Sequence, residues 1–244
     1  MSRFYEFSKE GNQKALNLFN EAIGIDSEFA LSFSQAAFCY VQRKAFAWRV
    51  DVSQELGEAE RLARRALEFD GSDPRVLANA GWVLVYVVGD FEVGEANVDL
   101  SVELDPNLAL GWTLRGWTKL LLGNHMTALE AFKRALRLSP RDPRIFLAQT
   151  GMANAHFLAG RYDEALSLAA MATRHRPNFL GAISVAVASH ALIGHLDEAR
   201  RTCTLYRHFD PSARIANVKE RLVFRGVEDV EKFAHGLRLA GMPE

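Results

Sequence analysis

The chain has 244 residues, of which 49% are hydrophobic and 24% are charged, with 7 prolines and 17 glycines. This composition is ordinary for a folded protein and excludes collagen-like and extensively disordered chains. The formal net charge of −1 gives no general attraction to nucleic acid or anionic lipid, and the apolar runs are too short to span a bilayer. The N-terminus has no long apolar signal segment, and Cys39 and Cys203 indicate no disulfide framework. We therefore expect a cytoplasmic protein with neither nucleic-acid nor membrane partners.

Amphipathic helices are predicted along the whole chain, because apolar residues recur at helical spacing between turns marked by glycine or proline. The segment SRFYEFSKEG, before the first of them, reads as the end of an earlier helix. We therefore expect a fragment or a shortened relative of a longer protein. The predicted helices cover residues 12–25, 28–44, 54–69, 74–88, 91–104, 108–122, 125–138, 142–159, 162–175, 179–193, 196–209, 212–224 and 227–239.

A small residue recurs early in every second helix, and an apolar residue follows it four positions later. The spacings between these small residues are 44, 35, 34, 37 and 34, so the repeat centres on 34. Small side chains let two helices approach closely, and we expect these residues to lie at helix contacts. They are Ala15, Ala59, Gly94, Ala128, Ala165 and Ala199.

The best-formed copy of this repeat is residues 112–140, which read WTLRGWTKLLLGNHMTALEAFKRALRLSP. This copy resembles the tetratricopeptide repeat, a helix hairpin of about 34 residues. One position departs from the family pattern, because Arg115 stands where leucine is preferred. We expect Arg115 to find an acidic partner and to brace the joint between repeats, with a ligand role as the second choice. The matching positions are Trp112, Gly116, Gly123, Ala128, Phe132, Ala135 and Pro140.

The resemblance implies an all-α fold, a right-handed α-α superhelix of about six helix hairpins followed by a C-terminal capping helix pair. It implies a single solenoid domain over residues 1–244. The expected parts are an incomplete first repeat at 1–27, a long second repeat at 28–73, repeats at 74–107, 108–141, 142–178 and 179–211, and the cap at 212–244.

A closer likeness lies in the ends and the middle of the chain, at RFYEFSKEGNQKALNLFNEAIGIDSEFA, LARRALEFDGSDP and GLRLAGMPE. These stretches resemble the C-terminal tetratricopeptide region of a family of bacterial, chiefly rhizobial, proteins. In that family the region follows a class III adenylate/guanylate cyclase domain or a winged-helix DNA-binding domain. The paired metal-binding aspartates and the recognition helix of those domains are not identifiable in the sequence. The resemblance therefore implies a regulatory or sensory region for an activity located outside this chain.

The chain has histidine and cysteine residues, but their spacing is not that of a catalytic or metal-binding site. His156 and His190 take equivalent places late in consecutive first helices, but no cysteine or carboxylate stands at ligand spacing beside them. Cys39 and Cys203 fall inside predicted helices, where cysteine usually packs as a small hydrophobic residue. We therefore predict no catalytic residue, no metal site and no cofactor, and we expect that the protein is not an enzyme.

The first helices of stacked hairpins line the concave side of a solenoid, and their inner positions are aromatic and apolar here. This lining predicts a groove that binds a peptide or a helical protein segment, so the chain would be an interaction scaffold with a protein partner. Self-association stays open. The alternative is that the aromatic residues only fill the space between hairpins, and the exposure of Trp82 and Trp117 distinguishes the two. The predicted lining residues are Phe38, Trp82, Tyr86, Thr113, Trp117, Leu121, Thr150, Asn154 and Ser184, and the same register includes Leu158 and Ala188.

Overall fold

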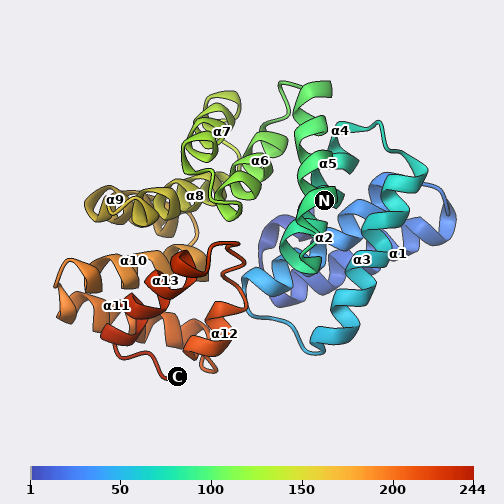
Figure 1. The fold of residues 1–244 in the computed structure, drawn as a ribbon. Coiled ribbons are helices and arrows are strands. Elements are labelled where there is room, and N and C mark those ends of the chain that lie inside the picture. Colours follow the sequence, from blue (N-terminus) through green and yellow to red (C-terminus); the bar gives the residue numbers. More distant parts are fainter. Residues whose placement is uncertain (1) are drawn as a thin grey trace. The chain divides into compact units, whose positions relative to one another are not determined.

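The computed structural model describes the backbone of residues 2–244 and the side chains from residue 4 onward. Within this range every regular element is a helix, and no strand occurs (Figure 1). The prediction of an all-α fold is thereby confirmed. The helices group into two compact units, Met1–Thr118 and Lys119–Glu244.

The first unit contains two complete helix hairpins, α2–α3 and α4–α5, preceded by α1. Several of its helices begin at a side chain that accepts a hydrogen bond from the first turn, including Ser8 before α1 and Asp51 before α3. The elements are η1 (Ser2–Glu6), α1 (Lys9–Ile25), α2 (Ala30–Ala45), α3 (Val52–Phe69), α4 (Pro74–Val83), η2 (Leu84–Val88), α5 (Phe91–Leu104) and most of α6 (Ala109–Leu121).

The second unit contains α7, the hairpins α8–α9 and α10–α11, and a C-terminal segment. Most predicted helices are found within three residues of their expected ends. The exception is the helix expected at 212–224, where only Ile215–Lys219 is helical. The elements are α7 (His125–Leu138), α8 (Ile145–Leu158), α9 (Tyr162–His175), α10 (Leu180–Leu192), α11 (Leu196–Phe209), α12 (Ile215–Lys219) and α13 (Val227–Leu239).

The small residues of the repeat lie where helices meet, as predicted. All six of them are buried. In the first unit, a Cβ atom added to Gly81 of α4 would lie 2.9 Å from the carbonyl oxygen of Gly94 in α5. In the second unit, a Cβ atom added to Gly151 of α8 would lie 2.1 Å from Cζ of Phe132 in α7. Only glycine permits either approach without a rearrangement of the neighbouring helix.

Arg115 of α6 finds the acidic partner that was expected. Its Nε donates to Oδ1 of Asp99 in α5 at 2.8 Å, and its guanidinium lies 5.4 Å from the centre of the Trp112 ring. Both partners are in the first unit. The departure from the family pattern is therefore explained by an ion pair that joins consecutive helices.

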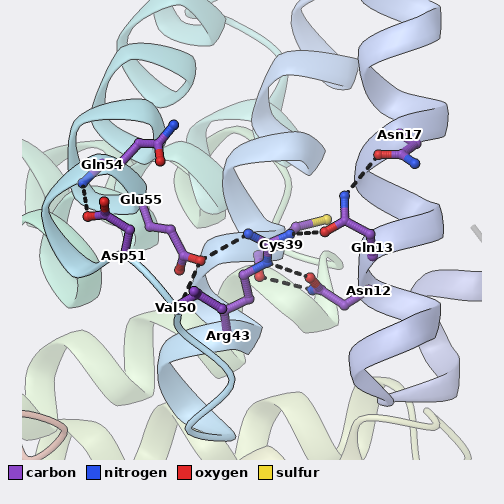
Figure 2. Close-up of polar contacts among 9 residues, drawn as sticks. All are labelled: Asn12, Gln13, Asn17, Cys39, Arg43, Val50, Asp51, Gln54 and Glu55. Atoms are coloured by element: carbon purple, nitrogen blue, oxygen red, sulfur yellow. Dashed lines mark hydrogen bonds and ion pairs between the residues drawn. The ribbon is translucent and has the colours of Figure 1, made fainter.

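A polar network at Arg43 joins the first three helices (Figure 2). Arg43 of α2 donates to Asn12 Oδ1 in α1 at 2.9 Å, to Gln13 Oε1 at 2.7 Å and to Glu55 Oε1 in α3 at 3.1 Å. The Glu55 carboxylate also accepts the backbone N–H of Val50 at 3.4 Å. The segment between α2 and α3, residues 46–51, is called the inserted loop here, because it lengthens the second repeat. The Glu55 carboxylate thus binds both Arg43 and this inserted loop.

Candidate functional site

Most of the predicted lining residues are buried. Tyr86 and Trp117 are half-buried, and the other seven are less than 9% exposed. Tyr86 and Trp117 are therefore the two members of the set whose side chains retain surface that a partner could contact. Trp82 is only 5% exposed, so most of its ring packs against protein. The buried ones are Phe38, Trp82, Thr113, Leu121, Thr150, Asn154 and Ser184.

Three of these residues form an aromatic cluster in the first unit, defined here as Trp82, Tyr86 and Trp117. The rings of Trp82 and Tyr86 are stacked, with centres 5.1 Å apart and an angle of 5° between their planes. The rings of Trp82 and Trp117 lie 6.4 Å apart at 45°. The structure therefore brings Trp117 of α6 against Trp82 and Tyr86, which the sequence placed in the preceding repeat.

Lys44 adds a cation to the aromatic cluster. Its ammonium lies 4.8 Å from the centre of the Tyr86 ring, and it donates to the backbone oxygen of Tyr86 at 2.5 Å. The lysine side chain comes from the last turn of α2 and is 6% exposed. A cation–π interaction is stronger when the cation is removed from water, so the buried Lys44 ammonium helps to fix the orientation of the Tyr86 ring.

The backbone around Tyr86 is unusual, because Leu84–Val88 forms a π-helical turn at the end of α4. Gly89 closes this turn in the left-handed conformation, with φ of 89°, and its N–H donates to the oxygen of Leu84 at 2.9 Å. Single π turns within helices are frequent at functional sites. Here the wider turn accompanies the contact between Lys44 and the Tyr86 carbonyl group.

The polar candidates of the second unit bond to their own helices. Asn154 donates to the oxygen of Thr150 at 2.8 Å, and Ser184 donates to the oxygen of Gly181 at 3.0 Å. The hydroxyl oxygen of Thr150 is buried without a hydrogen-bond partner among the described protein atoms. The side chains of Asn154 and Ser184 therefore stabilise backbone carbonyl groups of their own helices.

The cysteines and the two equivalent histidines have environments that favour their neutral forms. Burial raises the pKa of the Cys39 thiol to about 12 and also raises the pKa of Cys203. Burial likewise lowers the pKa of His156, and the pKa of His190 is lowered by burial together with the nearby His195. Thiolate and imidazolium are therefore the disfavoured forms at these positions.

Two kinds of feature do not occur in the described range. Within residues 2–244, no group of three or more histidine, cysteine, aspartate or glutamate side chains is placed to hold a metal ion. None of the helices in the same part of the chain is both long enough and apolar enough to cross a bilayer.

Residues 120–188 match a family model described as tetratricopeptide repeat. Among curated proteins, the chain is 26% identical over 212 residues to the human superkiller complex protein 3, and 25% identical to the mouse protein. Each alignment covers 80% of this chain and 12% of the relative, so the chain spans about an eighth of the length of these proteins.

Several solved structures share the fold. The Cut9–Hcn1 complex of APC/C aligns with a TM-score of 0.67 and 12% identity, over 93% of this chain and 46% of that one. The pilus biogenesis factor PilW aligns with a TM-score of 0.61 and 14% identity, over 84% and 90% of the two chains. A tetratricopeptide protein of Thermus thermophilus aligns with a TM-score of 0.58 and 16% identity, over 93% and 99%. These likenesses support the α-α superhelix fold, and the family match adds tetratricopeptide-repeat sequence over residues 120–188.

Proposed function

We propose that the chain is a non-catalytic interaction module, which binds a peptide or helical protein segment on the surface that the first helices form within a unit. The observation that carries this proposal is the aromatic cluster, in which Tyr86 and Trp117 are only half-buried while Trp82 beside them is buried. Tryptophan and tyrosine contribute much of the binding energy at protein interfaces, because they bury a large area at little conformational cost.

The chemistry of the cluster favours an apolar partner side chain. Stacking on Trp82 and the Lys44 ammonium against the ring hold the Tyr86 ring in place before a partner arrives. Such preorganisation lowers the entropic cost of binding. The human relative is named as a member of a protein complex, which accords with an interaction role for a chain of this fold. The other lining residues, the cytoplasmic location, self-association and a regulatory role beside a cyclase or transcription regulator stay predictions.

Selection from a display library of helical peptides tests this function and requires no identified partner. We expect peptides selected on the intact protein to lose about 30-fold or more in affinity for a Tyr86→Ala/Trp117→Ala variant, because an interface hot spot contributes about 2 kcal/mol or more. Fluorescence anisotropy of labelled peptides measures the loss.

Trp48→Ala is the matched control, since Trp48 is also a half-buried tryptophan but stacks on Phe46 in the inserted loop. Peptides selected on the intact protein should bind this control as well as they bind the wild type. Selected peptides that bind the double variant with undiminished affinity would exclude the aromatic cluster as the binding site.

A further inference from the structure

The C-terminal segment of the second unit returns to the first helices. Within the second unit, the first helices α8 and α10 each pack on the second helix before them, α7 and α9. By contrast, α13 packs on the first helix α10 and only slightly on the second helix α11 (Figure 1). A Cβ atom added to Gly236 of α13 would lie 2.8 Å from Cα of Ala188 in α10. Ala188 belongs to the register that predicts the lining of the concave side. The two backbones therefore meet at a position expected to face a ligand.

A second contact holds α13 to the end of α8. The ammonium of Lys232 donates to the oxygen of Leu158 at 2.9 Å, and it lies 5.5 Å from the Phe157 ring centre and 5.4 Å from that of Tyr162. Phe233, the next residue, is fully buried with its ring centre 4.2 Å from that of Phe157. The end of α8 thus binds a basic residue and the aromatic residue next to it at the same place.

A third contact lies at the start of the segment. The N–H of Arg225 donates to the oxygen of Leu121, at the end of α6, at 2.8 Å. Leu121 is itself a predicted lining residue. The segment from Arg225 to Gly236 consequently touches lining positions of three successive first helices, α6, α8 and α10.

The α13 helix has the form of a ligand for a helical groove. Phe233, Ala234, Leu237 and Ala240 are buried, while Glu228, Glu231, His235 and Arg238 are exposed. Buried positions separated by three or four residues are how an amphipathic helix binds in a groove. The exposed side chains of α13 do not face the first helices, so other residue types could replace them. The basic, aromatic and small residues on the packed side of α13 therefore determine which helical segment this surface binds.

We propose that α13 is a resident ligand of the first-helix face in the second unit, and that a partner helix with the same pattern displaces it. The pattern is a basic residue, an aromatic residue directly after it, and glycine three residues later, as in Lys232, Phe233 and Gly236. This inference rests on the proposed function and names its regulation. Because α13 is tethered, its effective concentration at the face is about millimolar, and a partner must overcome that advantage.

A labelled peptide of residues 222–244 tests the proposal on the full chain. Wild-type protein should bind it weakly, because its own α13 covers the face. Gly236→Leu should bind it at least about tenfold more tightly, because a side chain at 236 forces α13 off Ala188. A peptide that carries Lys232→Glu and Phe233→Ala should bind neither the wild type nor the Gly236→Leu variant. Fluorescence anisotropy measures the affinity of each peptide for each protein.

Gly57→Leu is the matched control, since Gly57 is exposed in a helix with nothing within 4 Å of an added Cβ atom, and it should behave as wild type. Lys232→Glu in the full chain is a second way to release α13, and circular dichroism follows folding. Equal binding to wild type and both released variants would overturn the proposal, and so would no binding to folded variants or loss of folding in both. Failure of the Tyr86 and Trp117 test alone would refute the aromatic cluster and leave these results standing.

Discussion

Replacing Gly151 with alanine is expected to lower the free energy of unfolding by about 3 kcal/mol, the upper end of ordinary overpacking costs. The added methyl group would lie 2.1 to 2.6 Å from three atoms of the Phe132 ring. That ring is fully buried, so it cannot move aside into solvent. Urea unfolding followed by circular dichroism measures the change.

Two further variants give the Gly151 prediction its controls. Gly57→Ala adds the same methyl group at an exposed helical position, where it should stabilise by about 1 kcal/mol because alanine favours helix. Phe132→Leu in the Gly151→Ala background should recover part of the loss, because it removes the ring that the methyl group meets. Unchanged stability of Gly151→Ala would show that α7 and α8 are not packed as the structure has them.

Replacing Glu55 with alanine is expected to cost about 3–5 kcal/mol, because it leaves the buried charge of Arg43 without its carboxylate. The Arg43 and Glu55 side chains are 15% and 9% exposed. The same change removes the acceptor for the Val50 N–H in the inserted loop. Chemical unfolding gives the stability, and the comparison is with the exposed pair Glu58 and Arg61.

Glu58→Ala should change stability by no more than about 1 kcal/mol, since exposed ion pairs contribute little. The double change Arg43→Met/Glu55→Leu should be far milder than Glu55→Ala alone, because it removes both buried charges. If Glu55→Ala and Glu58→Ala cost the same, Arg43 would have another way to satisfy its charge, and the network would not fix the first three helices.

The sequence predicted the helices and their pairing well, because both depend on short-range patterns. The burial of Ala59, Ala128 and Ala165 follows directly from a small residue at one point of each repeat. The acidic partner of Arg115 was also expected, since a charge on an inner helix position needs compensation.

The candidate site was less predictable, because a repeat register gives the face of a helix and not what covers that face. Trp82 and Thr150 were placed correctly on first helices, yet their side chains are buried. The π turn at Leu84–Val88 and the contact of Lys44 with Tyr86 depend on packing between helices distant in sequence. No local sequence pattern predicts the π turn or the lysine contact.

The path of the C-terminal segment could not be predicted from the sequence for a similar reason. The apolar spacing of Val227–Leu239 predicts a helix but does not name its neighbour. A helix was expected over 212–224, but irregular backbone follows Lys219. The Asn217 side chain bonds the backbone on the N-terminal side of α12, at Ser212 and Arg214. The irregular stretch then brings Arg225 to the end of α6.

Hydrogen exchange of the full wild-type chain, read by mass spectrometry, tests most directly whether the first-helix face takes up a helical segment reversibly. If α13 is a displaceable ligand, its amides should exchange well before those of α10, on which it lies, because it opens without unfolding the hairpins. Addition of the 222–244 peptide should accelerate exchange in α13 and leave α10 protected. Exchange of α13 and α10 at the same slow rate, unaffected by the peptide, would show that α13 is a fixed part of the fold and would contradict its role as a resident ligand.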